Sequence, residues 1–458
     1  MGNKFFIYLL VCISQISIAQ ESFTLEQAIQ YALDHSDDLA IDELDVQNAA
    51  ASVKEFKSIG LPKVSGSLNY QYNFLKAINP VPDFISPSVY GVLFQEQVIP
   101  ERNLGEPEIF ELTFQTNHAL SGGLDASWLL FDGSYLVGLR GAKLFKELTS
   151  KSSAITEQGI RANVTKAYMN TLILEENAKI INDNLDNIMK LRNETQAFYE
   201  AGFVEQLDVS RIDLTVENLL TEKEKMKQLQ EINYNLLKFQ MNYPNNQEIR
   251  TSEDLETLVN LFKIQNIDIE EEIDYNLRAE YDQILIGQKL NELDKLRIQK
   301  GYLPNLTSRI GVAGSLQRNN LFDGTEAGIL PNAFVALSLN IPIYDGNEKK
   351  AQIQQRDITI QKADIEKTQF EKGIALQVRN AKLIYLNAKR ALDNALRGLE
   401  ITNDIYNKTV IKYKEGVGSS LEITQAESSL FEAQSKYINS LYDLLIAKTD
   451  IEIAKGTL

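Results

Sequence analysis

The 458-residue chain has few of the residue types that carry most catalytic and redox chemistry. It contains one cysteine, Cys12, and two histidines, His35 and His118. The histidines lie far apart in sequence, and neither has partners at the spacing of a metal site. Each is more simply interpreted as a surface or interface residue. No phosphate-binding loop, nucleophile motif or His-x-x-x-His pattern occurs. We therefore expect no enzymatic activity, no cofactor and no bound metal.

The chain also lacks the positive charge that nucleic-acid binding requires. Its 63 acidic residues outnumber its 46 lysines and arginines, which gives a formal net charge of −17. Binding to a phosphate backbone needs a basic face, so we expect no nucleic-acid partner. An acidic balance of this kind usually reflects only a well-solvated surface.

Long hydrophobic runs are missing except at the N-terminus, where the run is too short to cross a membrane as a helix. Lys4 precedes the apolar residues 5–13, and Ser17-Ile18-Ala19 has the small-x-small pattern of a cleavage site. Residues 1–19 are therefore predicted to be a secretory signal peptide. Because Cys12 lies inside this segment, we expect an exported chain with neither a disulfide nor a lipid anchor.

The rest of the chain is a duplication organised around two glycine-containing turns. The pattern Tyr-x-x-Gly-x-x-x-x-Leu-(Asp/Glu) occupies residues 199–208 and recurs, 214 positions later, at residues 413–422. A repeat of this length is too long for a solenoid unit and indicates a duplicated half. In each copy the glycine is predicted to end one helix, and the residues after the leucine to begin another. We divide the exported chain into a first half, a linker and a second half, at residues 20–243, 244–268 and 269–458.

Long helical patterns flank both turns. In the first half they cover residues 24–59, 133–201 and 207–243, and the second of these would be roughly 100 Å long. Apolar residues step 4-3-4-3, the spacing of a coiled-coil seam. The seam residues are Leu174, Ala178, Ile181, Leu185 and Ile188 in the first half, and Ile374, Val378, Ala381, Tyr385, Ala388, Leu392, Ala395, Leu399 and Thr402 in the second.

Four segments alternate between apolar and polar residues, which predicts β-strands with one apolar face. They are residues 63–74, 110–130, 305–316 and 335–343. Residues 76–109 hold five of the ten prolines and are predicted to form a long irregular loop.

Strands of this length and pattern are typical of outer-membrane barrels. Strands cannot lie in lipid with unpaired edges, and a barrel needs at least about eight strands to close. Four strands from one chain therefore predict a shared barrel, made of twelve strands from three chains or, as the minimal alternative, eight strands from two. The long amphipathic helices would project into water as a tube that continues the barrel.

Taken together, these features resemble the TolC-type outer-membrane efflux family over essentially the whole exported chain. The resemblance depends on the duplicated halves, on Leu-Pro before the first strand of each half, on the two glycine turns, and on an Asp-Gly pair before each long helix. These pairs are Asp132-Gly133 and Asp345-Gly346. One departure is Ser36-Asp37-Asp38-Leu39, where the family often has Asn-Pro-Glu-Leu.

The resemblance implies a homotrimer with a twelve-stranded barrel in the outer membrane of a Gram-negative cell and a helical tunnel in the periplasm. It also implies that a periplasmic adaptor protein and, through it, an inner-membrane pump meet the far end of the tunnel. The function it implies is a passive exit duct of a tripartite efflux system. Two alternatives stay open: the outlet of a type I protein-secretion system, and a coiled-coil scaffold outside any membrane.

By the same resemblance, the two turns form the narrow periplasmic aperture. Of the tip residues, Phe203, Val204, Val417, Gly418, Ser419 and Ser420 are expected to be exposed. The full set of residues expected at the adaptor-contacting tips is Gly202, Phe203, Val204, Leu207, Gly416, Val417, Gly418, Ser419, Ser420 and Leu421. Asp208 and Glu422 match the family's acidic position, and six carboxylates per trimer would favour cations. Both acids also suit the first turn of a helix, where the helix dipole stabilises them. We further hypothesise that Arg211 forms a gating link to a tip carboxylate.

Overall fold

The computed structural model of the chain describes residues 21–106, 108–255, 272–323 and 328–458. The predicted signal peptide and residues 256–268 of the predicted linker lie outside these ranges. The chain divides into two compact units. Within the described ranges, one comprises residues 21–50, 143–255, 272–292 and 358–458, and the other comprises residues 51–106, 108–142, 293–323 and 328–357.

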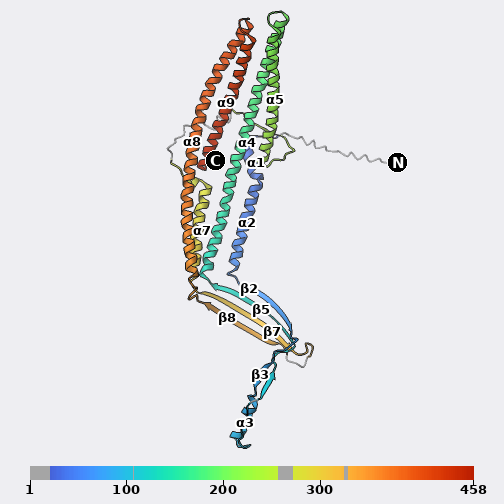
Figure 1. Cartoon of the computed structure of the whole chain (residues 1–458), viewed down its shortest axis with the longest axis vertical. Helices are drawn as coiled ribbons and strands as arrows, with labels where there is room; N and C mark the ends of the chain where they lie inside the picture. The colour runs from blue at the N-terminus through green and yellow to red at the C-terminus, as the bar shows by residue number, and fades with distance from the viewer. Residues whose placement is uncertain (1–20, 107, 256–271, 324–327) are drawn as a thin grey trace, which may run out of the picture. The chain divides into compact units, whose positions relative to one another are not determined.

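Long helices dominate the structure, and two pairs of them form hairpins (Figure 1). The first hairpin joins α4 (Gly133–Glu200) to α5 (Gln206–Gln240), and the second joins α8 (Glu348–Lys414) to α9 (Ser420–Lys455). Shorter elements accompany them: α1 (Leu25–His35), α2 (Asp37–Ser58), α7 (Ala279–Lys300), the 3-10 turn η1 (Tyr275–Leu277), and the parallel strands β1 (Glu21–Phe23) and β6 (Ile249–Thr251). The predicted helices on both sides of the first turn are confirmed to within a few residues.

The predicted helix over residues 24–59 is wrong in one respect, because the chain forms two helices there. Thr24 begins α1 with the expected capping box, in which the Gln27 side chain is the partner. Ser36 then leaves the helical conformation, with φ −66° and ψ 123°. Its Oγ accepts the N–H of Leu39 at 3.2 Å and so caps the start of α2. Periodicity continues across this serine, which explains why the sequence pattern missed the break.

The predicted coiled-coil seam forms the core between the helices. In α8, Ile374, Val378 and Ala381 are buried, and they pack against α9 residues that include Leu444 and Ile451. A second cluster lies near the turns and draws residues from all four hairpin helices. Its members are Leu185, Ile188, Leu191, Ile212, Leu219, Tyr413 and Ile423. The turns are therefore supported by a continuous apolar layer shared by both hairpins.

One antiparallel sheet contains the four long strands, in the order β2-β5-β7-β8. These are β2 (Lys63–Tyr72), β5 (His118–Phe131), β7 (Asn305–Arg318) and β8 (Leu330–Asn340). The register pairs Leu124 with Val312 and Ile310 with Val335. Strands from the two halves of the sequence thus meet side by side, with β5 of the first half against β7 of the second. Four long strands per chain are confirmed.

The two faces of this sheet differ sharply in polarity. One face, called the apolar face, carries one charged residue among the described strand positions, Arg318, which pairs with His118 at the strand end. The rest of this face consists of Val64, Gly66, Leu68, Tyr70, Tyr72, Leu120, Gly122, Leu124, Ala126, Trp128, Leu306, Ser308, Ile310, Val312, Gly314, Leu316, Pro331, Ala333, Val335, Leu337 and Leu339. The other face carries Ser, Thr, Asn and Gln side chains and an ion pair at 2.8 Å between Arg309 and Asp125. Large side chains on the apolar face, such as Leu68 and Val335, are exposed in the single chain.

Two predictions about the segment between β2 and β5 are wrong. The strand predicted over residues 110–130 is two strands, because β4 (Ile109–Leu112) pairs with β3 (Asn79–Pro82) in a separate hairpin. The predicted irregular loop also contains a helix, α3 (Ile85–Gln95). Pro87 is compatible with α3 because it lies in the first helical turn, where a missing N–H costs no intrahelical bond. Among the described residues, no helix is both long and apolar enough to cross a membrane.

Candidate functional site: the two hairpin tips

The first turn joins α4 to α5 through a glycine in the left-handed region. Gly202 has φ +79°, and the N–H of Phe203 donates to the carbonyl of Phe198 at 2.9 Å to close the end of α4. At the start of α5, the N–H of Glu205 donates to Oδ2 of Asp208 at 3.1 Å. The Asp208 carboxylate therefore caps the first turn of α5, where the helix dipole also favours a negative charge.

The second turn joins α8 to α9 and uses two glycines. Gly416 has φ +73°, and the N–H of Val417 donates to the carbonyl of Lys412 at 3.0 Å. A Cβ on Gly418 would lie 3.0 Å from the backbone nitrogen of Tyr413, so this position has no room for a side chain without a shift of the backbone. Ser419 then caps α9, and its Oγ accepts the N–H of Glu422 at 3.2 Å.

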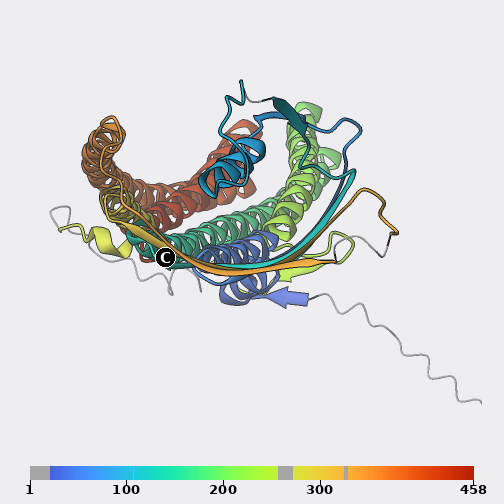
Figure 2. The same ribbon diagram turned by 90° about the horizontal axis from the view of Figure 1, so that it is seen from below.

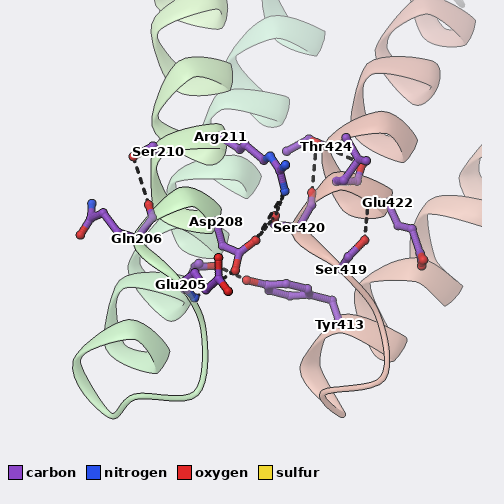
Figure 3. A network of polar contacts seen from close by, with 12 residues as sticks. Glu205, Gln206, Asp208, Ser210, Arg211, Tyr413, Ser419, Ser420, Glu422 and Thr424 are labelled. Atoms are coloured by element: carbon purple, nitrogen blue, oxygen red, sulfur yellow. Dashed lines mark hydrogen bonds and ion pairs between the residues drawn. The ribbon is translucent and has the colours of Figure 1, made fainter.

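Close to the turns, polar side chains tie one hairpin to the other. Ser420 Oγ donates to Oδ1 of Asp208 across the two hairpins (Figure 3). Arg211 donates to the same hydroxyl at 3.4 Å, and its Nη1 lies 3.7 Å from Asp208 Oδ1. Asp208, Arg211 and Ser420 thus form one compact cluster, with two members from α5 and one from α9.

A second tie lies in the buried layer beneath this cluster. The hydroxyls of Thr195 in α4 and Tyr413 in α8 are hydrogen-bonded at 2.9 Å, and both residues are buried. Burial raises the pKa of Tyr413, and the nearby Asp208 charge raises it further, although the bond to Thr195 opposes the shift. The hydroxyl is therefore neutral at physiological pH and remains available for this bond. Lys414 and Glu194 add an exposed ion pair between α8 and α4 at 3.0 Å.

The two acids at matching positions of the repeat differ in their surroundings. The Asp208 side chain is 22% exposed and contacts the opposite hairpin. The Glu422 side chain is 53% exposed, and its ion-pair partner is Lys412 of its own hairpin at 3.4 Å. Of the two, Glu422 is therefore the acid that an ion in solution can approach more freely.

A cleft of about 790 Å³ opens between the two tips. Its walls include Phe203, Asp208, Arg211, Tyr413 and Ser419. Phe203 and Val417 are exposed, as predicted, whereas Val204 is only partly exposed. Leu207 and Leu421 are exposed as well. Exposed apolar side chains beside an open cleft are typical of a protein-binding surface.

The prediction that Ser420 is exposed is wrong, since its side chain is 1% exposed and faces the Asp208 carboxylate. Gly202, Gly416, Gly418 and Ser419 lie in the turns as expected. The hypothesised pairing of Arg211 with a tip carboxylate appears in the structure as the contact with Asp208. A role for that contact in gating stays a prediction.

Sequence reasoning missed a buried acid in the second hairpin. Glu427 of α9 is 3% exposed, and burial raises the pKa of its carboxyl group, while the hydroxyl of Tyr406 opposes that shift. Burial and the Glu427 charge together raise the pKa of Tyr406. The position of Glu427 among the apolar residues of α9 could have indicated from the sequence that its side chain is buried. The sequence pattern could not, however, identify the residue that Glu427 contacts.

The structure gives no support for a metal site among the described residues, where no group of three or more His, Cys, Asp and Glu side chains is suitably placed. The two histidines have local partners. His35 donates its Nδ1–H to the carbonyl oxygen of Tyr31 in its own helix at 2.9 Å, and His118 Nδ1 lies 2.8 Å from the Tyr70 hydroxyl.

Comparison with known families and structures agrees with this arrangement. The sequence profile of the outer membrane efflux protein family matches residues 28–242 and 299–457. These two segments contain both hairpin tips and all four long strands. The chain belongs to the outer membrane efflux protein family.

Relatives with low identity extend over most of the chain. Outer membrane protein TolC of Vibrio cholerae is 22% identical over 354 residues, which cover 74% of this chain and 77% of that protein. The crystal structure of CusC, a transmembrane channel, matches with a TM-score of 0.74 at 15% identity and covers 95% of this chain and 92% of CusC. Outer membrane protein VceC of Vibrio cholerae matches with a TM-score of 0.68 at 13% identity, covering 94% and 96%.

At such identities the solved structures show the fold, and the family match shows the class of protein. The resemblance to TolC-type proteins inferred from the sequence is confirmed. The chain is an outer-membrane protein with a periplasmic extension, and its relatives are efflux proteins and channels.

Proposed function

We propose that three copies of the chain form the exit duct of a tripartite efflux system. In this proposal each copy contributes its four strands to a twelve-stranded barrel in the outer membrane. The helices of the three copies form a periplasmic tunnel. Substrates supplied by an inner-membrane pump and a periplasmic adaptor pass through the duct to the exterior, and the duct itself performs no chemistry.

The observation that carries this proposal is the four-stranded sheet with its apolar face. Among the residues that the structure describes, β2 pairs only with β5, and β8 only with β7, so the described sheet of one chain has two open edges. In lipid, each unpaired backbone group costs several kcal/mol. Pairing β8 of one copy with β2 of the next removes both edges when the sheets of all copies together form one closed barrel.

The two faces of the sheet suit a barrel in lipid. The apolar face would contact lipid, with its one charged residue, Arg318, at the strand end. The face with Arg309, Asp125 and the short polar side chains would line a water-filled interior. Strand lengths of 10, 14, 14 and 11 residues match the roughly 9–11 residues that a tilted strand needs to cross a bilayer. We favour three copies over two because the relatives are trimeric channels by resemblance and an eight-stranded interior is filled by its own side chains.

The polar ties at the tips support a gate. The contacts Ser420–Asp208 and Tyr413–Thr195 hold the second hairpin of a chain against the first. Breaking these few bonds would let the hairpins separate without loss of the seam farther from the turns. We assign this separation to the opening of the duct, with Arg211 strengthening the closed arrangement through Asp208 and Ser420.

An adaptor protein is the partner that we assign to the cleft and to the exposed apolar tip residues. Phe203 and Val417 lie on different hairpins, so a partner that contacts both would favour a particular spacing between them. A ligand shifts a two-state equilibrium only by its differential affinity for the two states. An adaptor that binds the separated tips more tightly would therefore open the duct.

The proposal is tested by purifying the protein from detergent-solubilised outer membranes and measuring its mass by light scattering. We expect a trimer that conducts ions in a planar bilayer. Leu337→Asp places a charge in the middle of the apolar face and should prevent stable assembly in the membrane, because a charge facing lipid costs about 2–4 kcal/mol at the membrane centre for Arg or Lys and somewhat less for Asp. Ser338→Asp is the matched control on the opposite face of the same strand. A water-soluble monomer without conductance would contradict the proposal.

A further inference from the structure

The connection between β2 and β5 carries a helix, α3, that the described part of the chain leaves largely uncovered. Within residues 73–117, of which the structure describes all but 107, the β3–β4 hairpin supports α3. None of the 11 residues of α3 is buried. Nonetheless, the segment from Phe84 to Gln95 contains no charged residue and is apolar around most of its circumference. A helix of this composition is normally buried against other protein.

The two sides of α3 are not equivalent. On one side, Tyr90 and Phe94 are half-buried, their rings stack at 6.1 Å, and the Arg102 guanidinium lies over Tyr90 at 5.3 Å. This side faces the chain's own connection. On the other side, Ile85, Val89 and Val92 follow the i, i+4, i+7 spacing of a helix-packing stripe. Each of these three side chains is more than half exposed, at 58%, 52% and 58%.

Charge argues against two of the possible occupants of this stripe. Residues 77–112 contain six acidic residues and a single basic one, Arg102. Anionic lipid headgroups attract clusters of Lys and Arg, so this segment would be repelled by them. A protein partner that binds through ion pairs is also unsuitable, because α3 itself carries no charged residue. The remaining occupant is the same helix of another copy. Identical helices can pack around a symmetry axis when the faces in contact carry no like charges. The stripe of Ile85, Val89 and Val92 fulfils this condition.

Topology places the three copies of α3 close together in the proposed trimer. The connection leaves the sheet at the pair Tyr72–His118, which is the strand end remote from the start of α4. Seen along the long axis, the sheet is curved and α3 projects onto its concave side (Figure 2). In a closed barrel the concave side is the interior, so three-fold symmetry brings the helices toward a common axis at the outer end.

We propose that the α3 helices of three copies pack stripe to stripe on the three-fold axis and form a plug at the outer end of the duct. This inference rests on the proposed trimer. The occupant of the exposed stripe is therefore the same stripe of two further copies. The duct would then have two constrictions, the polar ties at the periplasmic tips and an apolar three-helix contact at the outside.

Cysteine cross-linking tests the plug, because the only native cysteine, Cys12, lies in the predicted signal peptide. Val89→Cys would be oxidised in outer membranes and in the purified protein, and the products separated on a non-reducing denaturing gel. A disulfide forms only when two Cα atoms come within about 7 Å, so we expect most of the monomer band to shift to a dimer. Gly91→Cys is the matched control, since Gly91 lies on α3 away from the stripe with open space around it.

The mass of the unoxidised protein, measured on the same samples, separates the two possible failures. A trimer in which Val89→Cys forms no more dimer than Gly91→Cys would overturn the plug and leave the duct proposal intact. A particle that is not a trimer would overturn both. A cross-link from Val89→Cys to a different outer-membrane protein would also overturn the plug, because another occupant would then cover the stripe. As a second measure, Val89→Asp with Val92→Asp should raise the conductance of the trimer above that of Gly91→Asp.

Discussion

The two helical hairpins share a sequence pattern, but they use its conserved spacing for different tasks. Asp208 caps α5 and also accepts a bond from Ser420 of the other hairpin, whereas Glu422 pairs with Lys412 within its own hairpin. The matching positions Val204 and Gly418 differ as well, since only the second turn packs so tightly that a Cβ would meet the backbone. The two copies thus share the same turn, but the acid of the first copy contacts the other hairpin and the acid of the second copy contacts only its own.

From this difference we expect one group of residues to control separation of the hairpins and another to affect only the preference for cations. In the proposed gate, the hydrogen bonds Ser420–Asp208 and Tyr413–Thr195 contribute free energy only while the two hairpins are in contact. Glu422 makes its ion pair within one hairpin, so this contact can persist after the hairpins separate. Substitutions at the two kinds of position should therefore have distinct effects.

The largest effect is expected for Ser420→Ala, which removes the bond to Asp208 without disturbing the cap of α5. Hydrogen bonds to charged groups contribute about 1.5–3 kcal/mol, and about 1.4 kcal/mol corresponds to a tenfold change in an equilibrium constant. The population of open ducts should rise by about tenfold or more, and cells should become more sensitive to bulky antibiotics. Ser210→Ala is the control, because the Ser210 hydroxyl bonds only to the carbonyl of Gln206 in its own helix. Equal sensitivity of the two variants would contradict the assigned role of Ser420.

A smaller effect is expected for Tyr413→Phe, which keeps the ring in the buried layer and removes the bond to Thr195. A neutral hydrogen bond contributes about 1 kcal/mol net, equivalent to about a fivefold change in the open population. The same antibiotic assay measures it. The control is Tyr199→Phe, at the matching position of the first turn, where the side chain is 38% exposed. If Tyr199→Phe opened the duct as much as Tyr413→Phe, the buried tie would not distinguish the two turns.

The buried acid of α9 predicts a dependence of stability on pH. Burial raises the pKa of Glu427 in the folded state above its ordinary value of 4.5. An acid with a raised folded pKa stabilises the fold most when protonated, so this contribution is complete below the ordinary pKa and is lost as pH rises through the raised value. The melting temperature of the wild type should therefore fall over that range more than that of Glu427→Gln, as measured by calorimetry. Parallel pH profiles would show that Glu427 is not the titrating group.

The smallest effect on gating is expected for Glu422→Gln. Its exposed ion pair with Lys412 is of a kind that contributes about 0–1 kcal/mol, so the open population should hardly change. Cation preference should nevertheless fall, because three exposed carboxylates would be lost from the tips of a trimer. Reversal potentials across a salt gradient measure this preference. A large rise in conductance instead would mean that Glu422 holds the hairpins together, as Ser420 is proposed to do.

The helices and most strands could be predicted because their periodicity is a local property of the sequence. The 4-3 seam in α8 and the alternation of β7 each follow from neighbouring residues. The division between β4 and β5 could not be predicted, since alternation continues across residues 113–117 while the backbone changes its partner strand. Helix α3 was not predicted because the prolines in and around it indicated an irregular loop.

The tip site was predicted in its composition but not in its contacts. The repeat located both turns and both acids, because the turn chemistry requires glycine and favours an acid in the first helical turn. The bond between Ser420 and Asp208 depends on the relative register of helices that are 212 residues apart in sequence. No local pattern encodes that register, and the resulting burial of Ser420 was therefore missed.

The most direct test of the tip gate is single-channel recording of the purified protein with both ties removed. The double variant Ser420→Ala with Tyr413→Phe should conduct far more than the wild type, and more than either single variant, because it removes both hydrogen bonds that join the hairpins. The control pairs Ser210→Ala with Tyr199→Phe. Conductance of the double variant equal to that of the wild type and the control would contradict the account, because the ties would then not hold the duct closed.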